Sequence, residues 1–189
     1  MEGRDATESP LPITLREAVC GSRWGLEAME MSGLERIRSA IERRLPESPC
    51  MRLSGLRPSE VGLGMASFAM PASPWWQLGT GVIAPGTLAF VADAAASGAV
   101  LSTLPPATAC SPLDLKLNFI RPVKPSPNEI TARGRVVHRG RTIAIVYCEL
   151  STEGKLVAIA NQSVLVLPGR SWDKPVHVAD EVPSDAGST

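Results

Sequence analysis

The sequence contains few of the side chains from which metal sites and disulfide frameworks are built. Only two histidines and four cysteines occur among its 189 residues. No histidine stands at metal-ligand spacing from the cysteines, and no C-x-x-C pair occurs among Cys20, Cys50, Cys110 and Cys148. This scatter argues against a zinc site and against a dense disulfide framework. We therefore expect reduced thiols and no bound metal.

An excess of charge of either sign is also missing, since 19 Lys and Arg residues balance 19 Asp and Glu residues. This balance gives the chain no electrostatic footprint of a nucleic-acid-binding or polybasic membrane protein. No stretch approaches the roughly 20 apolar residues that a membrane-spanning helix needs. Residues 1–20 are charged and interrupted by prolines, unlike a signal peptide. We expect a soluble, cytoplasmic protein that binds neither nucleic acid nor membranes.

The length fits one folded domain with an extension at each end. Residues 1–50 form the expected N-terminal extension. It contains one amphipathic helix between residues 32 and 45, with apolar positions at helical spacing: Leu34, Ile37, Ile41 and Leu45. Residues 51–170 are expected to form the domain. Residues 171–189 are typical of a flexible tail, because Asp, Pro, Ser and Gly leave little to bury.

The pattern of the domain predicts one buried helix and a sheet. Residues 85–100 are almost wholly small or apolar and begin with proline, as is typical of a first helical position. Turn-forming residues separate the expected strands, at 65–70, 113–120, 129–138, 142–151 and 156–167. We expect an α+β fold in which a curved antiparallel sheet wraps around the one long helix.

Asp93 is the candidate catalytic residue. It stands in the middle of the apolar helix with no Lys or Arg within one turn, and such a carboxylate is costly to bury. If it faces a cleft, it is suited to act as a general base or a nucleophile. If it points out of an open helix edge into water, it has no such role. The preceding segment, Gly79 to Gly86, favours a close approach of backbone N–H donors to a carbonyl.

Four segments carry a resemblance to a known family: residues 84–100, LDLKLNFIRPV at 113–123, ARGRVVHRGRTIAIV at 132–146 and GKLVAIANQSVLVLP at 154–168. In this order they resemble PaaI-type hotdog acyl-CoA thioesterases over residues 50–170. The resemblance implies a hotdog fold and hydrolysis of an acyl-CoA or acyl-carrier thioester. It implies no metal and no cofactor, because CoA is part of the substrate. It also implies a homodimer or a homotetramer built from two dimers.

By this resemblance, Asp93 attacks the thioester carbonyl or serves as base for the attacking water. The family usually opens this helix with His-Gly-Gly, where this chain has Ala84, Pro85 and Gly86. Pro85 has no N–H to donate to the thioester oxygen, so Gly86 or Thr87 would have to replace it. Loss of one such donor costs roughly 2.7–4 kcal/mol in the barrier. The alternative function is therefore a protein that binds acyl thioesters without hydrolysing them.

Further residues match the family less closely. Gln77 is nearest to the loop amide of the family, and Ser111 or Thr108 is nearest to a hydroxyl that contacts the acid across the dimer interface. The alternative for each is an ordinary loop group bonded to nearby backbone. Arginines suit the CoA phosphates, although they are equally consistent with a solvated surface, and the candidates are Arg121, Arg139 and Arg141.

The remaining aromatic and imidazole groups give weaker signals. Trp75 and Trp76 line an acyl pocket or belong to the core or a subunit interface. His138 and His177 are not placed beside Asp93 by the sequence. A hotdog dehydratase or isomerase normally requires a histidine beside the acid, so this third function is disfavoured.

Overall fold

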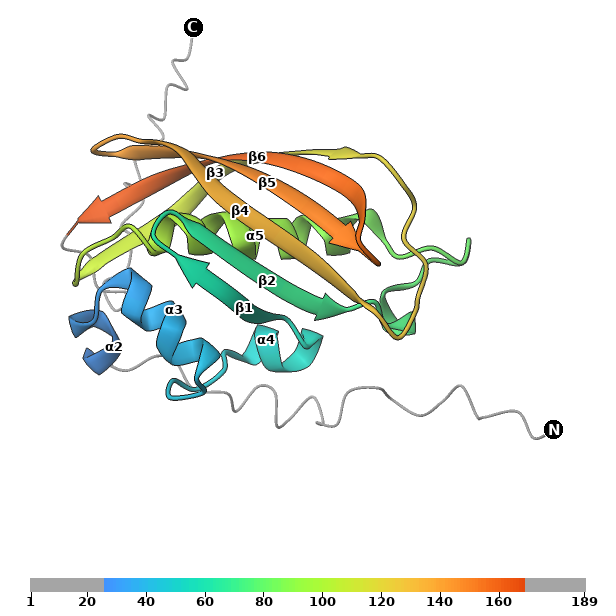
Figure 1. Ribbon diagram of the computed structural model, residues 1–189, viewed down its shortest axis with the longest axis horizontal. Helices are drawn as coiled ribbons and strands as arrows, with labels where there is room; N and C mark the ends of the chain where they lie inside the picture. Colours follow the sequence, from blue (N-terminus) through green and yellow to red (C-terminus); the bar gives the residue numbers. More distant parts are fainter. Residues whose placement is uncertain (1–25, 169–189) are drawn as a thin grey trace, which may run out of the picture.

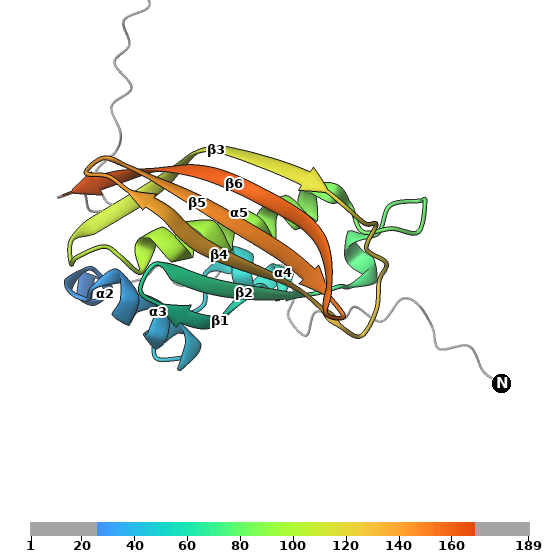
Figure 2. The same cartoon turned by 45° about the horizontal axis from the view of Figure 1, so that its top comes forward.

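The computed structural model describes residues 26–168, and the predicted tail at 171–189 lies outside this part of the chain (Figure 1). Its elements follow in the order α2 (Leu26–Glu30), α3 (Gly33–Ile41), α4 (Pro49–Ser54), β1 (Arg57–Gly62), β2 (Met65–Pro71), the 3-10 helix η1 (Pro74–Trp76), α5 (Pro85–Leu101), β3 (Thr108–Phe119), β4 (Glu129–Arg139), β5 (Ile143–Thr152) and β6 (Lys155–Pro168). The strands pair antiparallel in the order β1-β2-β4-β5-β6-β3. Figures 1 and 2 show α5 lying along one face of this curved sheet. The predicted α+β fold, a sheet curved around one long helix, is confirmed.

Two strands differ from the prediction, and both lie at the edges of the sheet. The segment RPSEVG of β1 was not predicted, because it is short and mostly exposed and lacks an apolar alternation. β3 begins at Thr108 rather than at 113 and includes Pro112, where the register with β6 shifts between Pro112 and Asp114. A proline is tolerated there because β3 hydrogen-bonds to a neighbour on one side only.

The seating of α5 against the sheet depends on residues with little or no side chain. A Cβ atom on Gly134 of β4 would lie 2.5 Å from the carbonyl oxygen of Ala95. A Cβ atom on Gly98 would lie 2.7 Å from a ring carbon of Phe68. The buried residues of α5 include four alanines that are fully withdrawn from solvent, which are Ala92, Ala95, Ala96 and Ala99. Helix and sheet therefore approach more closely than larger side chains allow.

The N-terminal extension packs on the edge of the sheet. Its helix α3 begins with a capping box, in which Ser32 and Glu35 each bond the backbone N–H of the other. The helix contacts β1, and Figure 1 shows it beside this edge strand. Arg36 is buried and donates to the carbonyl oxygen of Thr108 at 3.0 Å. The extension thus covers the β1 edge and holds the start of β3.

The amphipathic helix of the extension is shorter than predicted. It ends at Ile41 instead of continuing to Leu45, because Arg43 has a φ of 57°, in the left-handed region that a right-handed helix excludes. The next helix, α4, runs through the predicted boundary at residue 50.

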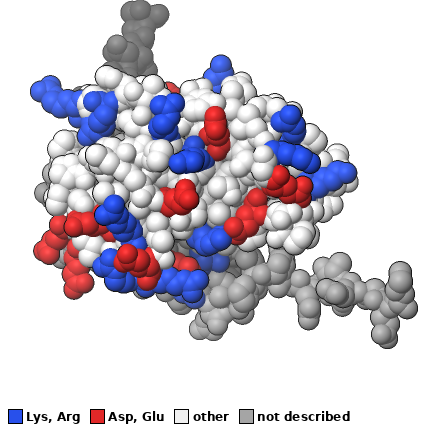
Figure 3. Space-filling view, in the orientation of Figure 1, with Lys and Arg blue, Asp and Glu red and all other residues white. Residues whose placement is uncertain are grey.

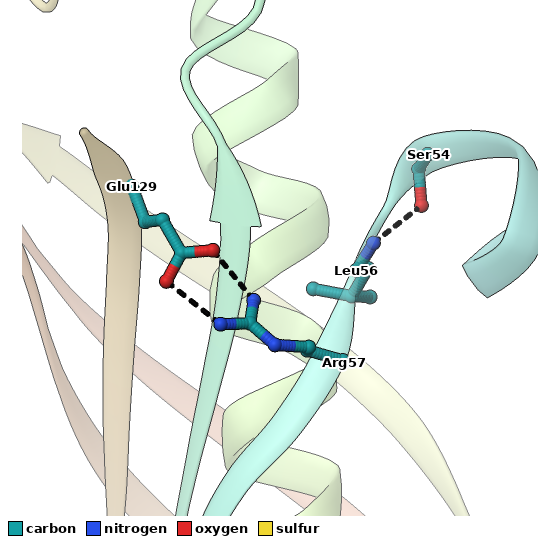
Figure 4. Close-up of polar contacts among 4 residues, drawn as sticks. All are labelled: Ser54, Leu56, Arg57 and Glu129. Atoms are coloured by element: carbon teal, nitrogen blue, oxygen red, sulfur yellow. Dashed lines mark hydrogen bonds and ion pairs between the residues drawn. The ribbon is translucent and has the colours of Figure 1, made fainter. Parts of the chain in front are cut away.

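An ion pair ties the edge strand β1 to β4 across β2 (Figure 4). Arg57 donates two hydrogen bonds to the carboxylate of Glu129, at 2.6 and 2.9 Å. The hydrogen bond that Arg57 donates to Glu129 raises the pKa of the Arg57 guanidinium. Nearby, the N–H of Leu56 donates to Ser54 Oγ at 3.2 Å, which joins α4 to β1. Both charged side chains are well exposed, so the pair stabilises the fold by no more than about 1 kcal/mol.

Charged side chains of both signs are interspersed over the face shown in Figure 3. The ion pairs found within residues 26–168 join Arg44 to Glu42 and Arg57 to Glu129. In the same part of the chain, no helix combines the length and the apolar character that crossing a membrane requires.

The three cysteines within the described residues are free thiols, as expected. Cys50 is exposed on α4, whereas Cys110 and Cys148 lie on β3 and β5 and are largely withdrawn from solvent. Burial raises the pKa of the Cys110 thiol to about 11 and that of Cys148 to about 12. The two inner thiols are therefore poor nucleophiles near neutral pH.

Alkylation with iodoacetamide at pH 8 is expected to modify Cys50 well before Cys110 and Cys148. Reagent reaches Cys50 directly, while a pKa of about 11 leaves roughly one Cys110 thiol in 1,000 ionised at pH 8. Peptide mapping by mass spectrometry at successive times measures each site separately. Equal labelling rates for Cys50 and Cys110 would contradict the burial of Cys110.

Replacement of Gly134 by alanine is expected to lower the melting temperature. The new methyl group would overlap the backbone of α5 at Ala95, and such overpacking typically costs about 1–3 kcal/mol. Gly79→Ala is the matched control, because a Cβ atom there meets nothing within 4 Å. Thermal unfolding of both variants followed by circular dichroism checks the difference, and equal melting temperatures would show that α5 is not held by this contact.

Candidate active site

The carboxylate of Asp93 lies halfway along α5 and is half-buried. Its Oδ1 atom accepts a short hydrogen bond from Gln162 Nε2 and a long one, at 3.5 Å, from Ser97 Oγ. Within residues 26–168 no Lys or Arg forms an ion pair with it, and no hydrogen bond to Oδ2 is formed. One carboxylate oxygen is thus held by the protein, and the other is free to meet a ligand.

Gln162 is the functional candidate that the sequence-based prediction missed. It lies in β6, on the face that α5 covers, and only 1% of its surface is exposed. The inward positions of β6 are otherwise apolar, namely Ala158, Ala160, Val164 and Val166. A single amide in this alternating apolar row was the signal that could have identified it.

Ser97 and Cys110 complete the immediate surroundings of the acid. Ser97 follows Asp93 by four residues on α5, a spacing that puts both side chains on one helix face. Cys110 Sγ lies 3.9 Å from the carbonyl oxygen of Ser97. Burial raises the pKa of Cys110; Arg36 lowers it and the charge of Asp93 raises it further. The helical spacing could have identified Ser97, whereas the contact with Cys110 depends on the packing of β3 against α5.

At the start of α5, the two predicted oxyanion donors, Gly86 and Thr87, differ in whether the backbone N–H is already hydrogen-bonded. Ala84 is the N-cap and provides no side-chain cap, and Pro85 follows as the first helical residue. The N–H of Thr87 donates to the carbonyl oxygen of Ala84 at 2.9 Å, so it is occupied. Gly86 is exposed, and its N–H meets no acceptor within residues 26–168. Of the two candidates, Gly86 therefore keeps a free donor.

The loop before α5 holds the other predicted amide. Gln77 and Ile83 form an isolated antiparallel bridge, and the N–H of Ala84 donates to the carbonyl oxygen of Trp76 at 2.7 Å. This small hairpin leaves Gln77 exposed, and the structure does not bring its side chain to Asp93. Trp76 packs against the core, while its neighbour Trp75 is 60% exposed.

The predicted hydroxyl groups lie at the start of β3. Ser111 pairs with Leu165 on the outer face of the sheet, whereas Cys110 beside it faces α5. Thr108 is buried, and its hydroxyl donates to the carbonyl oxygen of Pro106 at 3.3 Å. Within one subunit neither hydroxyl meets Asp93, and a role across a dimer interface stays a prediction.

A cavity of about 290 Å³ lies beside the N-terminus of α5. Its lining is mostly apolar and includes Pro85 and Leu88 of the helix, Phe119 at the end of β3, and Arg121. Arg121 also lines an adjoining hollow of about 460 Å³, together with Lys124 and Lys155. A larger hollow of about 520 Å³ lies between α3 and the strands β1 and β2, and none of the predicted site residues lines it.

The three predicted phosphate-binding arginines do not lie together. Arg121 is exposed near the start of α5 and donates to the carbonyl oxygen of Leu156 at 2.6 Å. Arg139 donates to Thr103 Oγ1 at 3.3 Å, just beyond the C-terminus of α5. Arg141 is exposed in the adjacent β4–β5 turn. A helix of 17 residues is about 25 Å long, so a single subunit separates Arg121 from the other two.

Neither histidine is placed beside the acid by the described structure. His138 is exposed on β4 and makes no contact with Asp93, while His177 lies outside the described residues. Within residues 26–168, no three His, Cys, Asp or Glu side chains are grouped as metal ligands.

Comparison with known proteins finds thioesterases. The sequence model of the thioesterase superfamily matches residues 80–159, from the loop before α5 into β6. A phenylacetic acid degradation-related protein from Ralstonia eutropha is 27% identical, with a TM-score of 0.63 over 68% of this chain and 98% of that one. No curated protein matches the chain.

Two further solved structures share the fold at lower identity. The PaaI protein of Escherichia coli is 20% identical, with a TM-score of 0.64 over 74% of this chain and 97% of that one. A thioesterase from Haemophilus influenzae is 22% identical, with a TM-score of 0.63 over 75% and 94%. Residues 80–159 thus match the thioesterase superfamily, and the described chain has the hotdog fold of these PaaI-type thioesterases.

Proposed function

We propose that this protein hydrolyses acyl-CoA thioesters and that Asp93 is its catalytic carboxylate. The match of residues 80–159 to the thioesterase superfamily supports thioester hydrolysis as the general reaction. The observation that carries the assignment to Asp93 is a half-buried carboxylate with one oxygen held, while among residues 26–168 the other oxygen has no partner and no Lys or Arg pairs with the acid. Such a group is a suitable base or nucleophile, because nearby protein atoms fix its direction without consuming its charge.

The proposed reaction proceeds by one of two routes. As a base, Asp93 takes a proton from water, and the water oxygen bonds to the thioester carbonyl carbon. As a nucleophile, its own oxygen bonds to that carbon, and water later cleaves the resulting anhydride. In both routes the carbon–sulfur bond breaks, the sulfur takes up a proton, and a carboxylic acid and free CoA are released. The proposal requires only side chains and water, with no cofactor.

The negative charge that develops on the carbonyl oxygen needs a donor, and we assign this role to Gly86. The N–H of Thr87 already donates to Ala84, while that of Gly86 is free at an exposed helix start. The positive end of the helix dipole favours the same position. Pro85 removes one neighbouring donor, so Gly86 becomes the single backbone group on which the transition state depends.

We propose that the acyl or pantetheine portion of the substrate binds in the apolar cavity beside Pro85 and Phe119. The adjoining hollow supplies three cations for the phosphates of CoA, from Arg121, Lys124 and Lys155, although Glu153 also lines it. Arg139 and Arg141 of the same subunit are at the far end of α5, so we propose Arg121 as the main phosphate ligand among the three predicted arginines. A cytoplasmic location stays a prediction.

We infer that the protein functions as a dimer or a dimer of dimers, as the hotdog resemblance implies. β3 pairs with β6 on one side and with no strand of the described chain on the other. Its exposed apolar side chains, Leu113 and Phe119, are 54% accessible. A second subunit at this edge would cover them, satisfy the unpaired backbone groups and enclose Asp93 more fully.

Asp93→Asn is expected to reduce kcat by roughly 10²–10⁴-fold, since the amide can neither accept a proton nor attack the carbonyl. Free-thiol release from short, medium, long and aromatic acyl-CoAs measures turnover. Asp114→Asn, an exposed aspartate on the outer face of β3, is the matched control and should retain activity. Full activity of Asp93→Asn would show that Asp93 is not the catalytic carboxylate. Tight acyl-CoA binding by the wild type without turnover would favour the alternative of a non-hydrolytic binding protein.

Gly86→Pro is expected to lower kcat by roughly 10²–10³-fold, the usual effect of removing one oxyanion donor. Gly86→Ala keeps the N–H, and its methyl group meets nothing within 4 Å, so this control should differ little from the wild type. Melting temperatures of both variants separate a loss of helix structure from a loss of the donor. Equal kcat values for the two folded variants would remove Gly86 from the mechanism.

A further inference from the structure

The side-chain amide of Gln162 is buried, and only its N–H donor, not its carbonyl acceptor, forms a hydrogen bond within residues 26–168. Its Nε2 atom donates to Asp93 Oδ1, whereas its Oε1 atom is fully withdrawn from solvent and finds no hydrogen-bond partner among residues 26–168. A buried carbonyl without a partner destabilises a fold, and an apolar side chain of similar size would avoid that loss. Stability alone therefore does not account for a glutamine at this position.

The position of Gln162 makes its donor effective. Its backbone lies in β6 between β5 and β3, where it pairs with Val146 and Leu115. A side chain fixed to the interior of a sheet loses little further freedom when it binds a ligand or a neighbouring group. By comparison, Ser97 is on the same helix as Asp93 and binds Oδ1 at a distance of 3.5 Å, which is long for a hydrogen bond.

Both donors bind the same carboxylate oxygen. With Oδ1 engaged by Gln162 and Ser97, rotation of the carboxylate about its Cβ–Cγ bond would break both contacts. Oδ2 is therefore kept in one direction, away from the amide. Cys110 of β3 also lies near Asp93: burial raises the pKa of its thiol, Arg36 lowers that pKa, the charge of Asp93 raises it and Arg139 lowers it.

We propose that Gln162 is a positioning residue for thioester hydrolysis: it holds Asp93 from the sheet so that Oδ2 points at the water or the carbonyl carbon. This inference rests on the proposed function of Asp93. Under this proposal, a residue of β6, 69 residues from Asp93 in sequence, helps to orient the acid. The helix that carries Asp93 and the loop before it contribute as well.

Gln162→Met tests the donor directly, since methionine fills a similar volume without an amide. We expect kcat to fall on the order of 10- to 100-fold, as for a misplaced catalytic group, with KM little changed. The melting temperature should equal or exceed that of the wild type, because the unpaired carbonyl is removed. A purely structural role would give the opposite pattern, a lower melting temperature with wild-type kcat per folded molecule, and would overturn the inference.

Gln162→Glu tests the same contact through charge. A second carboxylate beside Asp93 disfavours ionisation of both groups together, so the acidic limb of the pH profile of kcat/KM should move to higher pH. Asn161→Asp is the matched control: it makes the same amide-to-acid change one residue away, at an exposed position. Equal shifts in the two variants would contradict a direct contact with Asp93.

A measurement without turnover separates this inference from the proposed function. The side-chain Nε2–H resonances of Gln162 in a ¹⁵N correlation spectrum should shift in Asp93→Asn and stay unchanged in Glu47→Gln, which alters an exposed acid between α3 and α4. If these resonances shift but the wild type hydrolyses no acyl-CoA, the proposed function fails while the Gln162–Asp93 contact stands. If they do not shift, the contact fails, and the positioning role fails with it, whatever the activity of the enzyme.

Discussion

The close seating of α5 on the sheet is the constraint on which the site depends. Gly134 of β4 has no side chain at the point where the backbone of Ala95 passes, and the buried alanines of α5 have small side chains. The helix can therefore lie close to the strands. Close packing of this kind resists small displacements, since interiors are about as dense as organic crystals. The consequence is functional as well as structural. Asp93 is two residues from Ala95, so a helix displaced from β4 would also move the acid relative to Gln162 on β6.

The two edges of the sheet are treated differently. At one edge, α3 covers β1, and the Arg57–Glu129 pair joins that strand to β4 across β2. At the other edge, β3 carries exposed apolar side chains such as Phe119 and pairs with β6 on its inner side, while no strand of the described chain pairs with its outer side. Edge strands invite pairing with other chains unless they are covered. The N-terminal extension therefore protects the edge that lies away from the acid, while the edge near the acid stays open for the subunit contact that we infer.

The proposed catalytic groups lie at different points along α5, and the helix dipole and its free N–H groups explain their positions. Free N–H groups and positive potential occur at the N-terminus, where Gly86 lies and where the apolar cavity opens. The acid lies halfway along, beyond the reach of that potential, and takes its donors from Ser97 and Gln162. Proline at the first helical position is favourable for the helix but removes a donor from the site. The proposed dependence on one remaining backbone donor is a direct consequence.

The sequence by itself determined the features that depend on neighbouring residues. The buried helix starting at Pro85, the central strands and the isolated acid at Asp93 follow from local periodicity and from the cost of burying a carboxylate. The edge strand β1 escaped prediction because, at the edge of a sheet, few of its side chains are buried to create a pattern. Only the tertiary structure decided that Gln162 meets Asp93, that Thr87 has lost its free N–H, and that Arg121 lies apart from Arg139. Such contacts join residues that are distant in sequence. They depend on the position of the helix relative to the strands, which the packing of the whole core determines.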